Sequence, residues 1–263
     1  MTLLIVIGRT DATSNELIDA AEQLARAGDW SIRTVLLQDD GLNAGGDTLP
    51  TTPVGGETET LSSDAVVSLS LATSSSGVTC VAAGVDASGD PDSLALRLLA
   101  APSVPLLLVR SGLRSPRTLR SLLVPLKGSP RASAAMLFVE STLCGPDREI
   151  VVLAVAGGAL PSEPGSFPVP RLIDQEQYEW SDWRDEFSRR FTGSMEGCEH
   201  RVKVAIGEPA DAILEEAREI DADLIVLAWR GRFVGGHGET VRRLIAVAPC
   251  PVLVVSPDLA SDV

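Results

Sequence analysis

Residues 121–126 read Ser-Leu-Leu-Val-Pro-Leu, a short apolar run in which polar and apolar residues do not alternate. Similar runs occur at residues 2–7 (TLLIVI), 104–109 (VPLLLV) and 251–255 (PVLVV). Continuous apolar runs of this length are typical of strands that are buried on both faces of a parallel sheet. The stretches between them have the spacing of amphipathic helices. The pattern therefore predicts an α/β fold with doubly wound, mainly parallel sheets.

This pattern occurs twice along the 263 residues of the chain. Each copy opens with one of the apolar runs and closes with another, and a basic stretch that contains Ser and Pro separates the copies. Such an internal repeat predicts two tandem domains, residues 1–110 and 121–263, joined by a linker at residues 111–120.

The second copy is the clearer of the two. We expect its further strands at residues 150–155, 201–206 and 223–228, and its helices at 131–143, 174–191, 209–220 and 239–247. In the first copy we expect a helix at 13–27, strands at 31–37 and 78–85, and a short helix around 64–72. Residues 39–63 are rich in Gly, Thr and Pro and are expected to be mobile, which leaves one strand and one helix of the second copy without a counterpart.

The second copy resembles the universal stress protein family. The motifs that carry the resemblance are LLVPLKGSP at 122–130, GEPADAIL at 207–214, ADLIVL at 222–227 and APCPVLVV at 248–255, in the order of the family. The first copy resembles the family only in APSVPLLLV at 101–109, so it is identified as a degenerate copy. The resemblance implies Rossmann-like domains that pack as a pseudo-dimer within the chain.

Family members that bind ATP carry a glycine motif followed by a helix start. Its glycines let the backbone approach phosphates, and the amides of the helix start face the anion. Here Ala228 replaces the first glycine, the loop between Gly231 and Gly238 is short, and Glu239 stands where the family has Ser or Thr. The resemblance also implies an acidic residue after the first strand of the copy, and this chain has Lys127 there.

These changes predict a degenerate pocket for a nucleotide or a smaller anion. Its candidate residues are Lys127, Arg230, Gly231, Gly235, Gly238, Glu239 and Thr240. A carboxylate at the helix start repels a triphosphate and satisfies the positive end of the helix dipole itself. We therefore expect no cofactor, with ATP or AMP as the alternative.

The composition limits the kinds of partner. The formal net charge is −14, and such a surface repels the phosphates of nucleic acids and anionic lipids. The apolar run at residues 2–7 is too short to span a bilayer and lacks the features of a signal peptide, so a cytoplasmic protein is expected. No metal-ligand spacing is visible, and the four cysteines (Cys80, Cys144, Cys198 and Cys250) are expected to be free thiols.

Aromatic residues gather in one predicted helix, where Trp180, Trp183, Phe187 and Phe191 fall near one face. This stripe favours a core face that covers the sheet, with a partner-binding groove as the alternative. No nucleophile, base or metal set is visible. The sequence thus predicts a non-catalytic regulatory or interaction protein with an unknown protein partner, and the alternative is a nucleotide-dependent switch that binds ATP or AMP.

The closing runs of the two copies, which begin at Val104 and Pro251, carry the expectation for assembly. Single-domain members of the family resemble one another in pairing through their last strand. In a tandem chain the two runs can pair with each other, antiparallel around a pseudo-two-fold axis, and so cover two apolar sheet edges. A homodimer through other surfaces is the alternative.

Overall fold

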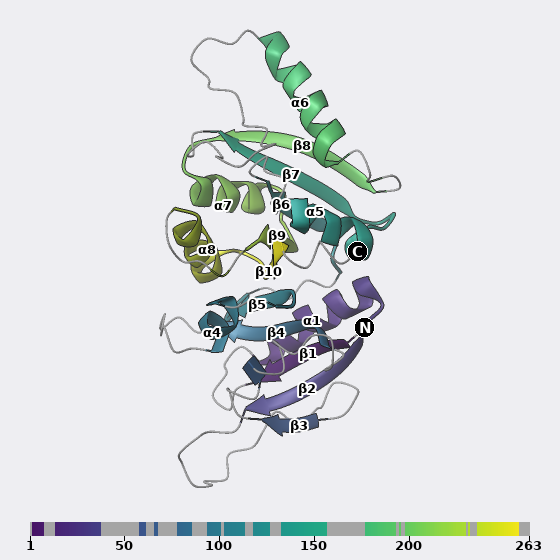
Figure 1. Ribbon diagram of the computed structural model, residues 1–263, viewed down its shortest axis with the longest axis vertical. Coiled ribbons are helices and arrows are strands. Elements are labelled where there is room, and N and C mark those ends of the chain that lie inside the picture. The colour runs from purple at the N-terminus through teal and green to yellow at the C-terminus, as the bar shows by residue number, and fades with distance from the viewer. Residues whose placement is uncertain are drawn as a thin grey trace.

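Ten strands form one sheet in the order β3-β2-β1-β4-β5-β10-β9-β6-β7-β8 in the computed structural model (Figure 1). The structure describes residues 2–7, 14–37, 58–61, 66–67, 78–85, 94–100, 103–113, 118–126, 133–156, 177–192, 195, 198–229, 231 and 236–257. The strands are β1 (Thr2–Ile7), β2 (Ser31–Leu37), β3 (Thr58–Leu61), β4 (Val78–Val85), β5 (Leu106–Arg110), β6 (Ser121–Pro125), β7 (Glu149–Ala156), β8 (Glu199–Ile206), β9 (Leu224–Ala228) and β10 (Val252–Val255).

Helices cover both faces of this sheet. They are α1 (Ser14–Gly28), α4 (Leu94–Ala100), α5 (Ser133–Phe138), the π-helical turn η2 (Val139–Leu143), α6 (Gln177–Phe191), α7 (Pro209–Glu219) and α8 (Gly236–Val247). Figure 1 shows α4, α7 and α8 on one side of the sheet and α1 and α5 on the other. This is the three-layer, doubly wound arrangement that the apolar runs predict.

Successive side chains of the central strands enter two different cores. Leu122 and Val124 of β6 pack in one buried cluster with residues of α1 and α5, whereas Leu123 packs in a second cluster with residues of α7 and α8. Both kinds of strand position are therefore apolar. This burial on two faces explains why the strand sequences show no alternation.

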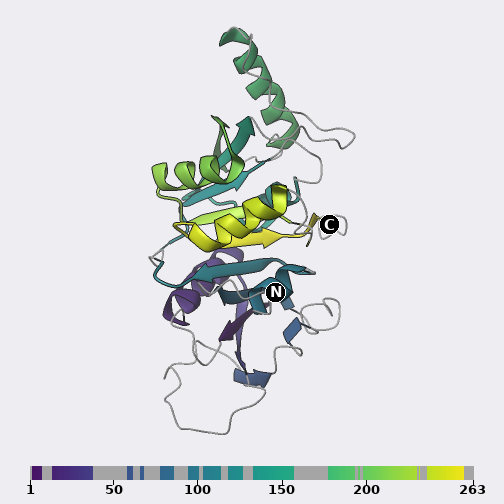
Figure 2. The same ribbon diagram turned by 90° about the vertical axis from the view of Figure 1, so that its left-hand side faces the viewer.

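The two halves of the sheet meet at β5 and β10. These strands pair antiparallel, with Leu253 opposite Leu107 and Val252 opposite Leu108, while the other strand pairs described are parallel. Figure 2 shows the two strands side by side at the middle of the molecule. The antiparallel pairing expected of these two runs is present, and it joins the halves as a pseudo-dimer with one continuous sheet.

Helix α7 illustrates how local sequence sets these elements. Pro209 is at its first turn, where no amide donor is needed. The Glu208 side chain accepts hydrogen bonds from the amides of Ala210 (2.8 Å) and Asp211 (3.2 Å), which satisfies the start of the helix. Ile213 then lies on the buried face. The predicted helix at 209–220 is thus confirmed, with its end at Glu219.

The first half differs from the expectation that it lacks a strand. Strand β3 lies within the stretch 39–63 that was expected to be mobile, and it pairs parallel with β2. Each half therefore has five strands in the described residues, in the same relative order. The prediction was wrong because an edge strand of four residues pairs through its backbone and needs no apolar run. Of the helix expected at 64–72, only residues 66–67 are described, and they are helical.

Two helices of the second half also differ in their bounds. Helix α8 begins at Gly236 and not at Glu239, since first-turn residues need no favourable side chain to be helical when later positions are packed. The helix predicted at 131–143 is an α-helix only over Ser133–Phe138 and continues as the π-helical η2.

The domain limits 1–110, 111–120 and 121–263 stay a prediction. Leu113 and Leu119, in the stretch between the halves, are buried in the core.

Candidate nucleotide or anion site

The candidate site lies at the ends of β6 and β9, where the helices that follow these two strands go to opposite faces of the sheet. These strands are neighbours and parallel, with Leu122 opposite Leu224. Helix α5 follows β6 on one face of the sheet, and α8 follows β9 on the other. A crevice at the carboxyl ends of two such strands is the usual ligand position in an open α/β sheet. The topology therefore brings the segment after β6 and the start of α8 to the same edge.

On the β6 side, hydrogen bonds and packing fix the chain as far as Leu126. The Leu126 amide donates a 2.9 Å hydrogen bond to the carbonyl of Leu153, and the Leu126 side chain is buried. Lys127 comes next in the chain and lies outside the described residues, as do Arg230 and Gly235. The contacts expected of these three residues stay a prediction.

On the β9 side, the end of the strand is held by the neighbouring strand β10 of the same half. The Trp229 amide donates to the carbonyl of Val255 (2.8 Å), and its indole is buried. Ala228, which replaces the first glycine of the binding motif, is the half-buried last residue of β9. The strand end is thus held by packing and hydrogen bonds. The Cβ of Ala228, which a glycine would lack, packs against the core on the α5 face of the sheet.

Four of the candidate residues lie in described segments. Gly231 has a φ of +73°, a left-handed conformation that favours glycine. Gly238, Glu239 and Thr240 lie in the first turns of α8, where Gly238 and Thr240 are buried and Glu239 is exposed. The amides of a helix start attract anions, and a carboxylate in that turn competes for the same positive end. Because Glu239 is exposed, water screens its repulsion of an incoming anion.

The described residues contain no cluster of three or more His, Cys, Asp or Glu side chains placed to hold a metal ion. None of the helices in the described segments is long and apolar enough to cross a membrane.

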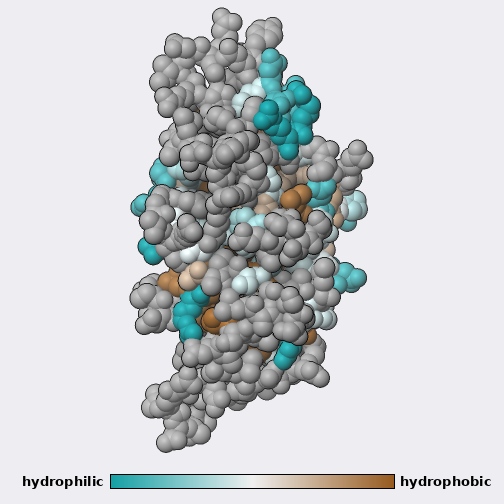
Figure 3. All heavy atoms as spheres, in the orientation of Figure 1, coloured by the Kyte–Doolittle hydropathy of each residue, from teal (hydrophilic) through white to brown (hydrophobic). Residues whose placement is uncertain are grey.

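The aromatic stripe of α6 is a core face where the structure describes it. Trp183 and Phe187 are buried, and their ring centroids lie 4.7 Å apart. The opposite face carries exposed charges such as Asp182 and Asp185, and Figure 3 shows hydrophilic side chains gathered there. The side chains of Trp180 and Phe191 lie outside the described part.

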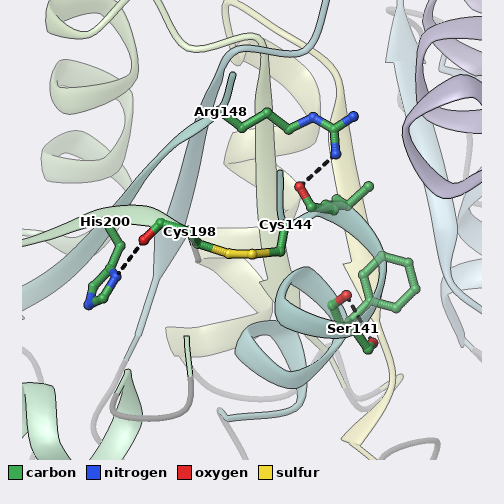
Figure 4. Close-up of a disulfide and its surroundings, with 7 residues drawn as sticks. Ser141, Cys144, Arg148, Cys198 and His200 are labelled. Carbon is green, nitrogen blue, oxygen red and sulfur yellow. Dashed lines mark hydrogen bonds between the residues drawn. A yellow bond between two sulfur atoms is a disulfide. The ribbon is translucent and has the colours of Figure 1, made fainter. Parts of the chain in front are cut away.

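A disulfide between Cys144 and Cys198 corrects the expectation of four free thiols (Figure 4). Their Cα atoms are 5.5 Å apart, within the usual range for a disulfide. Cys144 follows η2, and Cys198 precedes β8. No sequence pattern indicates this pair, because 54 positions separate the residues. Disulfides are uncommon in a reducing cytoplasm, so the cytoplasmic location stays a prediction.

The disulfide is flanked by a guanidinium and an imidazole (Figure 4). Arg148 donates a 2.7 Å hydrogen bond to the carbonyl of Leu143, the residue before Cys144. The ring nitrogen Nδ1 of His200 lies 3.1 Å from the carbonyl of Cys198. These contacts hold both chain segments next to the bridge in place.

The remaining cysteines, Cys80 and Cys250, are free and buried, as expected. Burial raises the pKa of the Cys250 thiol to about 12, and the nearby Asp223 carboxylate adds to this rise. Burial also raises the pKa of Cys80. Both groups are therefore neutral, inert parts of the core.

Sequence reasoning missed a groove beside β8, at the far end of the sheet from β3. It has a volume of about 500 Å³ and is lined by residues of α6, β8 and α7. Lys203 of β8 lies in it and donates to Glu216 (2.8 and 3.0 Å) and Glu219 (3.0 Å). The hydrogen bond to Glu216 is the main cause of a raised pKa for Lys203. The one available signal was a lysine between Val202 and Val204.

Comparison with known proteins places this fold and motif set in one class. The model of the universal stress protein family matches residues 118–256, and the chain belongs to this family. No curated protein matches the chain significantly.

Solved structures show the same fold over nearly the whole chain. A universal stress protein from Archaeoglobus fulgidus is 16% identical with a TM-score of 0.62, covering 97% of this chain and 96% of the other. A candidate universal stress protein from Pseudomonas aeruginosa is 14% identical with a TM-score of 0.57, covering 99% and 97%. At these identities the likeness supports the fold of both halves and no finer property.

Proposed function

We propose that this universal stress protein is a non-catalytic regulatory or interaction protein whose nucleotide sites are degenerate. The observation that carries the proposal is Glu239 in the first turn of α8. This helix starts at the edge of the sheet where the chain leaves the parallel neighbours β6 and β9 toward opposite faces. A negative side chain there opposes the binding of a phosphate group, by an amount that water reduces because Glu239 is exposed. Ala228 adds a Cβ at the end of β9, where the binding motif has a glycine.

The alternative is a nucleotide-dependent switch that binds ATP or AMP. Gly231, with its φ of +73°, and the glycines at the start of α8 favour it, because they leave backbone amides accessible to an anion. Under the main proposal the same features are remnants, and the protein works through a protein partner without a cofactor.

Isothermal titration of the whole protein with ATP, ADP and AMP, each with and without magnesium, separates the two. The main proposal expects no binding in the micromolar range by any of the three nucleotides. Micromolar binding of ATP or AMP would replace it with the switch. Incubation of the protein with ATP, followed by measurement of released phosphate, tests the absence of catalysis separately.

A further inference from the structure

Strand β8 ends the sheet with one edge unpaired in the described part of the chain. Its eight residues pair with β7 from Glu199 to Ile206 without a register shift, and no described strand lies on its outer side. The opposite end of the sheet is the four-residue β3, a short edge of the kind that proteins use to prevent unwanted pairing. The β8 edge is twice that length, and Ile206 at its end is 61% exposed.

The groove of about 500 Å³ follows this edge. Its floor is residues 202–205 of β8, one wall includes Arg184 of α6, and the other wall is α7, with Ala212 and three glutamates. Helices α6 and α7 belong to opposite faces of the sheet, since Phe187 packs in one buried cluster and Ile213 in the other. Within the described part of the chain, the groove therefore lies along the sheet edge between two helices, on the outer side of β8.

Two of the usual devices that protect a strand edge, a proline and a bulge, are missing here. Residues 199–206 contain no proline, and the pairing with β7 shows no bulge. The two basic side chains of the strand are turned toward their own half. Lys203 is bound to Glu216 and Glu219 of α7, and Arg201 forms a 3.0 Å ion pair with Glu149 of β7. Among the described residues, neither a further strand nor a basic side chain of β8 itself covers the outer backbone edge of this strand.

The two walls of the groove differ in charge. On α7, Glu215, Glu216 and Glu219 face a single ammonium, that of Lys203. Glu215 is exposed and has no ion pair within the described segments. The α6 side instead presents Arg184 and the half-buried Val202 and Val204, which pack against the core of that face.

We propose that the outer edge of β8 binds an extended peptide segment of a partner protein, which adds to the sheet as a further strand. Side chains of a strand alternate between its two faces, so the segment has Lys or Arg toward α7 at every second position and apolar residues toward α6. A second copy of β8 fits less well, because its own Arg201 and Lys203 are already held by Glu149 and Glu216. This proposal is independent of whether a nucleotide binds.

The first experiment uses a fluorescent eight-residue peptide of alternating lysine and valine with blocked termini, titrated into the whole protein. We expect binding in a 1:1 ratio. A control peptide with four lysines followed by four valines has the same charge and composition without the alternation. It should bind at least about tenfold more weakly, because only alternation places every lysine on the α7 side.

N-methylated peptides separate strand addition from charge attraction. Two isomers of the alternating peptide carry N-methyl groups on the odd or on the even residues. An added strand uses only every second amide to pair with β8, so one isomer should lose binding and the other should keep it. Simple attraction between the lysines of the peptide and the glutamates would give the two isomers equal affinities.

Variants of the protein locate the binding. Glu215→Arg replaces one of the three negative charges on the α7 wall by a positive charge and should weaken binding of the alternating peptide by about tenfold or more. Asp19→Arg makes a similar change in charge on an exposed position of α1, in the other half, and should leave the affinity within about twofold.

Three results would overturn the proposal. The first is no binding of the alternating peptide, or equal binding of the alternating and block peptides. The second is equal binding of the two N-methylated isomers. The third is a homodimer of the protein that Glu215→Arg dissociates while the peptide fails to compete, since a second copy would then occupy the groove.

Discussion

The indole nitrogen Nε1 of Trp229, at the end of β9, donates a 2.8 Å hydrogen bond to the carbonyl oxygen of Leu99 in α4. The two residues are 130 positions apart and belong to different halves of the sheet. Both side chains are fully buried. This bond ties the strand end beside the candidate site to the other half, and it adds to the antiparallel pairing of β5 and β10.

Replacement of Trp229 tests that link. Trp229→Phe removes the donor and leaves the buried Leu99 carbonyl without it, so we expect a loss of about 2–4 kcal/mol in the free energy of unfolding. Trp30→Phe is a matched control, because Nε1 of Trp30 is buried and has no hydrogen-bond partner in the described structure. It should cost at least about 1 kcal/mol less. Urea unfolding measures both, and equal losses would contradict the role of the hydrogen bond.

Removal of the charge at Glu239 should improve nucleotide affinity only weakly. Glu239→Ser removes a repulsion of about 1 kcal/mol in a partly screened site and adds a hydroxyl, so ATP should bind less than about tenfold more tightly. Ala228 and the short loop still limit the approach of the backbone. The melting temperature should stay within a few degrees, because serine suits a helix start.

The matching experiment is titration calorimetry on the variant beside Glu239→Gln, which removes the charge without adding a small hydroxyl. An affinity of either variant equal to that of the unmodified protein would show that Glu239 does not oppose binding. A rise of a hundredfold or more would show that the rest of the site is intact, contrary to the proposed function.

Most of the sheet could be predicted because its central strands are apolar on both faces. The apolar runs of β6 and β10 need to be buried inside a sheet in a chain of this composition. The order of the motifs along the chain then indicated which strands lie beside them. The pairing of Leu107 with Leu253 was predictable for the same reason, since both lie in apolar runs at domain edges. Strand β3, in contrast, reads TETL and is held by backbone pairing, which leaves no apolar signature.

Two other features that depend on contacts between distant segments could not be predicted. The Cys144–Cys198 bridge requires η2 and the start of β8 to meet, and spacing along the chain does not encode this. The groove beside β8 has Arg184 of α6 on one side and Glu215 of α7 on the other, and the sequence alone does not place these two residues along the same strand edge. In the candidate nucleotide site, Glu239 and Gly231 were found by motif spacing, but the exposure of Glu239 depends on how α8 begins.

The disulfide should contribute substantially to stability. Closing a loop of 54 residues reduces the entropy of the unfolded chain by an amount worth about 4 kcal/mol in the simplest chain model. The double variant Cys144→Ser, Cys198→Ser should therefore lose about 2–4 kcal/mol in urea unfolding. Reductant should lower the stability of the unmodified protein to that of the variant and leave the variant unchanged. Four reactive thiols in denaturant without reductant would contradict the bridge.

Alkaline pH should destabilise the protein partly through Cys250. Burial raises the pKa of its thiol from 9.0 to about 12, so between these values the unfolded chain releases a proton that the native state keeps. Because the unfolded state binds fewer protons, the free energy of unfolding falls as pH rises, by up to about 1.4 kcal/mol per pH unit. The contribution of the buried Cys250 thiol to the free energy of unfolding is fully present below pH 9.0.

Cys250→Ala removes the titrating group and changes little volume. Between pH 8 and pH 10, the unmodified protein should lose about 1.4 kcal/mol more than Cys250→Ala does. Both proteins share every other group that ionises in this range, so the difference of the two pH profiles isolates the thiol. Cys80→Ala should shift the profile in the same direction, since burial raises the pKa of that thiol as well. Parallel profiles for the unmodified protein and Cys250→Ala would mean that the thiol ionises equally well in the folded core, which its burial between β9 and α8 argues against.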